Sequence, residues 1–125
     1  MDGVVGAPGG QNSYEHCGCG YDAAGGVTWT QDVNQELTLK ALERLVTRYS
    51  RYDNLLGIEV LNEPGLEVES NHIDVLKAFY KKAYKTIRQH NEKVIIVFNE
   101  LWSQYYWVWA DEFLEPDYHN VVFDW

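Results

Sequence analysis

Apolar side chains recur at helical spacing in two parts of the chain, and both patterns predict amphipathic helices. The first helix is expected to begin at Asp32, with Gln35 placed to complete a capping box. Its apolar face consists of Leu39, Leu42, Val46 and Tyr49. The second helix is expected over residues 73–88. Its apolar face consists of Ile73, Leu76, Tyr80, Ala83 and Ile87.

Short apolar runs between and around these helices predict strands. Residues 55–61 and 94–98 are apolar almost throughout, which is typical of strands covered on both faces. A further strand is expected at residues 3–6 and another over residues 120–125, with a partly helical segment through residues 109–113. Because strands and helices alternate, the chain is predicted to form an α/β fold with about four parallel strands and three helices. The strands should follow one another in sequence order, with the helices on one side.

The charge of the chain narrows the choice of partners. A net charge of −9 argues against binding to nucleic acid, whose phosphates attract a basic surface, and against an anionic membrane surface.

The longest apolar run, residues 94–98, is far shorter than the roughly 20 residues that cross a bilayer. Met1 is followed by neither a basic start nor an apolar stretch. Either a secretory signal is absent, or the chain does not contain the natural start of its protein.

Two cysteines lie close together in a glycine-rich loop over residues 7–26. The sequence His16-Cys17-Gly18-Cys19 invites a metal interpretation, but two loop thiols are the favoured reading because a structural zinc site needs four ligands. The single residue between the cysteines also disfavours a local disulfide. No motif in the sequence signals a metal or an organic cofactor, and we expect neither.

Carboxylates follow three of the predicted strands. Ligands of parallel α/β folds bind at the carboxyl ends of strands, which draws attention to Glu63, Glu100 and Asp124. Counting by twos along the strand places Gly57, Glu59, Leu61 and Glu63 on one side. Pro64 should end that strand and leave Glu63 at its mouth. A carboxyl group there suits general acid catalysis on an acetal, although a glutamate in a surface turn fits the pattern equally well.

Three segments together resemble a known family. Residues 57–64 read Gly-Ile-Glu-Val-Leu-Asn-Glu-Pro, residues 6–12 read Gly-Ala-Pro-Gly-Gly-Gln-Asn, and residues 29–49 join the glycine-rich loop to the first helix. Taken in their order along the chain, they resemble the exo-β-1,3-glucanase branch of glycoside hydrolase family 5, a cellulase-like family. The resemblance implies a single partial (β/α)8 TIM barrel domain over residues 1–125, roughly the central half of a barrel that needs about 250 residues.

The resemblance also implies roles for individual residues. Glu63 would be the catalytic acid/base, and Asn62 would bind the sugar hydroxyl beside the reacting carbon. Members of the family are retaining enzymes whose glutamate nucleophile lies on a later strand, which is expected beyond Trp125. A histidine that relatives carry before the glycine-rich loop is replaced by Val5. The expected substrate is a β-glucoside or β-glucan, in particular β-1,3-glucan, and the expected location is extracellular or at the cell wall.

Further residues after the third strand are candidates for sugar contacts. Asn99 and Glu100 are expected at the rim of the site. Trp102 and Trp107, with the neighbouring Tyr105 and Tyr106, could form a stacking wall for sugar rings, while packing beneath a loop is an equal alternative. Glu100 or Asp124 as a replacement nucleophile is disfavoured, because nothing in the resemblance supports either.

Two other interpretations of the chain stay open from its sequence. The chain could be a non-catalytic carbohydrate-binding or interaction module derived from the barrel, or a truncated product with no stable fold. Without the nucleophile, the isolated chain is expected to be inactive. An unclosed half-barrel would also expose two strand edges, so self-association through these edges, aggregation or poor order is expected.

Overall fold

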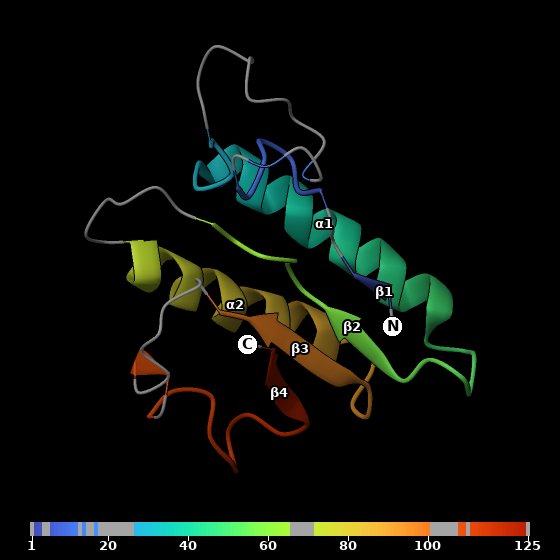
Figure 1. Ribbon diagram of the computed structural model, residues 1–125. Helices are drawn as coiled ribbons and strands as arrows, with labels where there is room; N and C mark the ends of the chain where they lie inside the picture. The colour runs from blue at the N-terminus through green and yellow to red at the C-terminus, as the bar shows by residue number, and fades with distance from the viewer. Residues whose placement is uncertain are drawn as a thin grey trace.

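The computed structural model describes residues 2–3, 6–12, 14, 17, 27–65, 72–100, 108–109 and 111–124. These residues form β1 (Asp2–Gly3), α1 (Asp32–Tyr49), β2 (Gly57–Glu59), α2 (His72–Arg88), β3 (Ile95–Asn99) and β4 (Val121–Asp124). The strands make one parallel sheet in the order β1-β2-β3-β4, with both helices on the same face (Figure 1). The predicted parallel sheet in sequence order is therefore confirmed.

The strands begin and end at different residues from those predicted. β1 lies at Asp2–Gly3, whereas Gly6 already belongs to a bend. β2 ends at Glu59 because the chain bends at Val60, although the Val60 N–H still donates to the Val97 carbonyl oxygen at 3.0 Å. Strand β2 is consequently shorter than the strand that the apolar run at residues 55–61 predicted.

The cap predicted for α1 is wrong. Gln31 occupies the N-cap position with an extended backbone and makes no side-chain cap hydrogen bond, while Asp32 is the first helical residue. There its carboxylate complements the positive end of the helix dipole instead. The buried face comprises Gln35, Thr38, Leu42 and Val46.

The predicted apolar face of α1 also needs correction at its end, since Tyr49 is exposed. Two polar residues take places on the buried face because the backbone satisfies them. The Thr38 hydroxyl donates to the Asn34 carbonyl oxygen at 2.9 Å, and the Gln35 side-chain amide donates to the Thr30 carbonyl oxygen at 3.4 Å. Burial of these groups therefore leaves no unpaired hydroxyl or amide behind.

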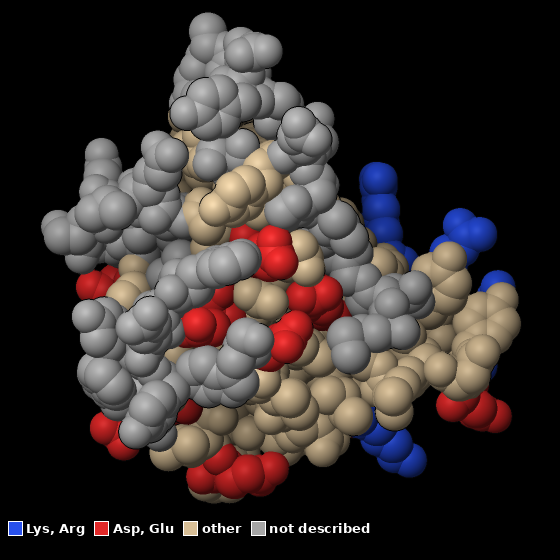
Figure 2. All heavy atoms as spheres, viewed as in Figure 1, with Lys and Arg blue, Asp and Glu red and all other residues tan. Residues whose placement is uncertain are grey.

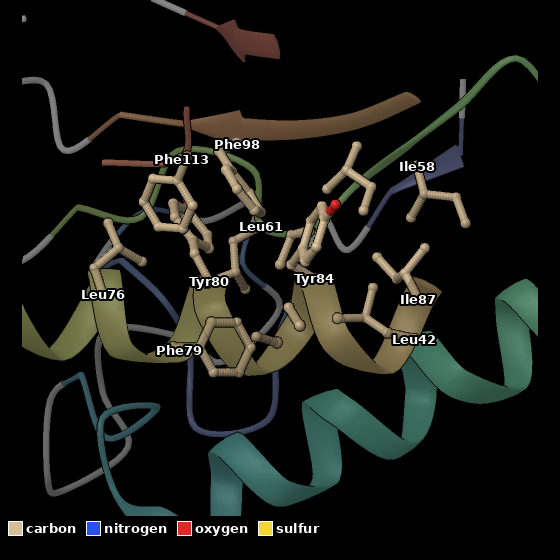
Figure 3. Close-up of a cluster of buried hydrophobic side chains, with 14 of the residues drawn as sticks. Leu42, Ile58, Leu61, Leu76, Phe79, Tyr80, Tyr84, Ile87, Phe98 and Phe113 are labelled. Atoms are coloured by element: carbon tan, nitrogen blue, oxygen red, sulfur yellow. The ribbon is translucent and has the colours of Figure 1, made fainter. Parts of the chain in front are cut away.

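Helix α2 forms as predicted and starts one residue earlier, at His72. It lies along the sheet, and its apolar face enters the core together with residues of α1 and the strands (Figure 3). The Tyr80 ring stacks on Phe98 of β3 with 4.2 Å between ring centroids and 10° between planes. Phe98 also contacts Phe113 and Phe123 at centroid distances of 5.0 Å and 5.8 Å. Aromatic packing thus joins α2 to β3 and β4.

The prediction of a third helix is wrong for the described part of the connection between β3 and β4. Val108 lies in a 3₁₀ turn, residues 109 and 111–120 form turns, bends and irregular backbone, and no α-helix is present among these residues. Phe113 has a φ of 50°, in the left-handed region that ends a right-handed helix. The side chains of Trp109 and Phe113 are nevertheless buried in the core. Among the described residues, neither helix has the length and apolar character to cross a bilayer.

Candidate active site

The two faces of the sheet differ in character because side chains alternate along each strand. Ile58, Ile96 and Phe98 belong to the core beneath the helices. Their neighbours Glu59 and Asn99 therefore lie on the opposite face. The pairing of β3 with β4 places Asp124 beside Asn99. The face away from the helices thus carries acidic and amide groups at the carboxyl ends of three adjacent strands.

Acidic side chains gather in the middle of this face (Figure 2). The Glu59 carboxyl forms a side-chain hydrogen bond with Asn99 and lies within electrostatic reach of Asp124 and Glu63. Burial raises the pKa of Glu59, the negative charges of Asp124 and Glu63 raise it further, and the Asn99 hydrogen bond opposes them. We use the name acidic face for Glu59, Glu63, Asn99 and Asp124.

Glu63 lies beyond the carboxyl end of β2 and is partly exposed. The sequence argument that placed it by counting through Leu61 is wrong, because Leu61 is fully buried against the helices (Figure 3). The bend at Val60 breaks the alternation. Glu63 nevertheless lies near Glu59 because the chain turns again, with a φ of 44° at Glu63. The predicted position at the strand mouth is therefore reached by a different backbone path.

The loop after β1 holds this turn. The Gln11 side-chain amide donates to the Asn62 carbonyl oxygen at 3.0 Å, and the Asn12 amide donates to the Glu63 carbonyl oxygen at 2.7 Å. Gln11 and Asn12 are 0% and 2% exposed, so the loop is anchored in the molecule rather than lying on its surface. Sequence reasoning used both residues only as part of a resemblance and missed this contact. Two adjacent carboxamides in the loop after β1 were the available signal.

The end of β3 is held from the helix side. The buried Tyr80 hydroxyl donates to the Asn99 carbonyl oxygen at 2.6 Å. Burial raises the pKa of Tyr80 well above its usual value, and the Glu59 charge adds to this effect. Glu100 follows with only 9% of its surface exposed, and its backbone N–H donates to the Asp124 carbonyl oxygen at 3.2 Å. Helix α2 thereby fixes the strand end from which Asn99 reaches the acidic face.

Several sequence candidates lie outside the described residues. Trp102 and Trp107, with Tyr105 and Tyr106 between them, are among these, as are His16 and Cys19. The Cys17 sulfur is buried and donates to the Asn12 carbonyl oxygen at 3.0 Å. The described ranges contain no cluster of three or more His, Cys, Asp or Glu side chains arranged to hold a metal ion. Cys17 contributes instead to the packing of the loop that carries Gln11 and Asn12.

The charge at Glu59 is expected to make stability depend on pH. Because its pKa is raised in the folded state, folding favours the protonated form, and Glu59 costs stability as the pH rises through that raised pKa. We expect Glu59→Gln to raise the melting temperature by a few degrees at pH 7 and to have almost no effect near pH 4. Thermal unfolding at both pH values measures this. Glu36→Gln, at an exposed residue, is the control. If Glu59→Gln changed the melting temperature equally at both pH values, the electrostatic explanation would be contradicted.

The fold and the acidic face together define a segment of a parallel (β/α) barrel that includes the carboxyl ends of its strands, where barrel enzymes place their active sites. A family model described as "Cellulase (glycosyl hydrolase family 5)" matches residues 23–125. The chain belongs to this family, as the motifs around residues 6–12 and 57–64 indicated.

Three curated relatives of the chain are named as glucan 1,3-beta-glucosidases. A "Glucan 1,3-beta-glucosidase" of Schwanniomyces occidentalis is 34% identical over 125 residues, which is 95% of this chain and 27% of the relative. A "Probable glucan 1,3-beta-glucosidase A" of Aspergillus terreus is 33% identical over 76% of this chain and 22% of the relative. A "Sporulation-specific glucan 1,3-beta-glucosidase" of Saccharomyces cerevisiae is 32% identical over 95% of this chain and 26% of the relative. The chain therefore spans about a quarter of the length of these relatives.

A solved structure supports the fold. Endo-glycoceramidase II from Rhodococcus sp. superposes on 55% of this chain and 17% of its own chain, with a TM-score of 0.50 and 21% sequence identity. At this identity the likeness concerns the fold alone. It agrees with a partial barrel, as the resemblance implied.

Proposed function

We propose that this chain is the acid/base segment of a retaining glycoside hydrolase that cleaves β-glucosidic bonds, with β-1,3-glucan as the substrate. The observation that carries the proposal is the position of Glu63 on the acidic face, beyond the carboxyl end of β2 and within electrostatic reach of Glu59. The family of the chain and the names of its relatives support the choice of substrate.

In the proposed reaction, Glu63 donates a proton to the glycosidic oxygen as the bond to the anomeric carbon breaks. A second carboxylate attacks that carbon and forms a glycosyl-enzyme intermediate, which requires the two carboxyl groups to lie about 5–5.5 Å apart. Glu63 then removes a proton from the water that releases the sugar. We expect the nucleophile outside these 125 residues, so the chain by itself should be inactive.

Other residues are proposed to bind the sugar. Asn62 would contact the hydroxyl beside the anomeric carbon, a bond that strengthens in the transition state. Asn99 and Glu100 would contribute polar contacts at the rim, and Trp102 and Trp107 would stack on sugar rings. The glucan substrate makes an extracellular or cell-wall location part of the same proposal, and self-association of the isolated chain through its sheet edges stays a prediction.

Hydrolysis of laminarin by the full-length protein tests the proposal. We expect release of glucose whose anomeric configuration is β immediately after cleavage, because a double displacement retains configuration. Proton NMR of the early products distinguishes the two anomers. Release of the α-anomer would contradict the retaining mechanism. Binding of laminarin without any hydrolysis would instead favour a carbohydrate-binding module.

A further inference from the structure

We infer that Gln11 and Asn12 are positioning residues that set the direction of the catalytic acid by holding the backbone of Asn62 and Glu63. The inference rests on the proposed function of Glu63 and extends it to a second segment of the chain. Neither residue needs to touch the substrate for this role, since both act through the backbone that carries the acid.

The contacts connect parts of the chain that are 51 residues apart. Each of two consecutive carbonyl groups, at Asn62 and Glu63, accepts one side-chain amide proton, at 3.0 Å and 2.7 Å. The β-ladder of β2 has already ended at Glu59, so the sheet does not supply these bonds. The amides of Gln11 and Asn12 thereby continue the fixation of the backbone beyond the end of the strand.

The backbone at Glu63 has a particular need for such support. Its φ of 44° lies in the left-handed region, which costs a non-glycine residue on the order of 1 kcal/mol or more and persists only where the surroundings hold it. The adjoining Pro64 restricts the backbone further. A carboxyl group that starts from this strained position would point elsewhere if the turn relaxed.

Both carboxamides are themselves fixed at their other end. The Gln11 Oε1 atom accepts the Ala7 N–H at 2.9 Å, and the Asn12 Oδ1 atom accepts the Tyr14 N–H at 3.0 Å. Since Gln11 and Asn12 are also buried, their side chains have a defined orientation toward the turn. The loop therefore acts as a rigid brace between the ends of β1 and β2.

A specific kinetic signature follows from this geometry. Displacement of a catalytic group by about 1 Å can lower a rate by about 100-fold. A misplaced acid slows only those substrates whose leaving group needs a proton, whereas general damage to the fold slows all substrates alike. The dependence of kcat/KM on the leaving group therefore separates positioning from stability.

Asn12→Asp in the full-length protein is the test. The aspartate keeps an oxygen for the Tyr14 N–H but loses the N–H that donates to Glu63. We expect kcat/KM to fall about 10–100-fold for phenyl β-glucoside and to change less than about threefold for 2,4-dinitrophenyl β-glucoside, which needs no proton. Asn12→Ala, which adds no charge, and Gln11→Glu, which keeps the acceptor for Ala7, should show the same selective loss.

Asn91→Asp is the matched control. Asn91 likewise accepts backbone N–H groups, from Lys93 and Val94 at 2.9 Å, and donates its amide to the Ser50 hydroxyl at 3.2 Å, but it lies before β3 at the opposite end of the sheet. This variant should lower the melting temperature without changing the dependence on the leaving group.

Glu63→Ala in the same assay separates the inference from the function on which it rests. If Glu63→Ala shows the selective loss while the variants of Gln11 and Asn12 leave both substrates unchanged or slow both equally, the positioning role is overturned and the proposed acid stands. If Glu63→Ala itself slows both substrates equally or neither, the proposed function fails. Because three variants break the two bonds separately, the result does not depend on the folding of any one of them.

Discussion

Glu63→Ala is expected to lower kcat on laminarin by about 10²–10⁴-fold, the range that a positioned general acid contributes. The sugar leaving group is a poor one and needs a proton as the bond breaks. Removal of the carboxyl group takes away the proton donor but leaves Glu59, Asn99 and Asp124 of the acidic face in place. The measurement is steady-state release of glucose by the full-length variant beside the unchanged protein.

Azide provides an independent check on the same variant. With 2,4-dinitrophenyl β-glucoside, the glycosyl-enzyme still forms, because the departing phenolate needs no proton. Azide then attacks the anomeric carbon, the bond to the nucleophile breaks, and β-glucosyl azide is released without any base. We expect azide to accelerate turnover of Glu63→Ala and to yield this product. Restored turnover that gives only glucose would contradict the assignment, and Glu115→Ala, at an exposed residue, serves as the control.

Phe98→Ala is expected to have the largest effect on stability, a loss of about 3–5 kcal/mol in the free energy of unfolding. Phe98 has 0% of its surface exposed and contacts aromatic rings from α2, from β4 and from the connection between β3 and β4. Truncation would leave a cavity that these rings cannot fill without losing their own contacts. Urea unfolding monitored by tryptophan fluorescence measures the change.

Val122→Ala is the control for this prediction. Val122 lies on the paired strand β4 but is 49% exposed, so its truncation should change the free energy of unfolding by less than about 0.5 kcal/mol. A loss for Phe98→Ala as small as that of the control would mean that the aromatic cluster between α2 and the sheet contributes little to stability.

The positions of α1 and α2 could be predicted from the sequence because helices depend on local periodicity, and the order of the strands followed from their alternation with helices. Apolar residues at spacing of three and four define α2 to within one residue of its observed start. Runs of β-branched residues define β3, and alternation with helices requires parallel pairing. The Asn-Glu-Pro motif beyond β2 predicted Glu63 as the acid, and this motif together with residues 6–12 and 29–49 indicated the family that the family model shows.

Tertiary contacts decided what local patterns leave open. The N-cap of α1 is Gln31 and not Asp32. The residue at which a helix begins depends on the path of the incoming loop and not on capping chemistry alone. Leu61 turned toward the helices because the core offered it a buried place, which broke the alternation used to orient Glu63. Aromatic side chains replaced the expected third helix among the described residues around Phe113.

The hydrogen bonds from Gln11 and Asn12 to the backbone of Asn62 and Glu63 are likewise decided by the tertiary structure. Hydrogen bonds between residues 51 positions apart leave no periodic trace in a single sequence, because each amide needs only a carbonyl at the right place in space. The sequence by itself thus determined α1, α2, the order of the strands and the family, and it predicted Glu63 as the reacting group. Only the tertiary structure decided how the backbone of that group is held, since distant segments meet only after the sheet and helices have packed.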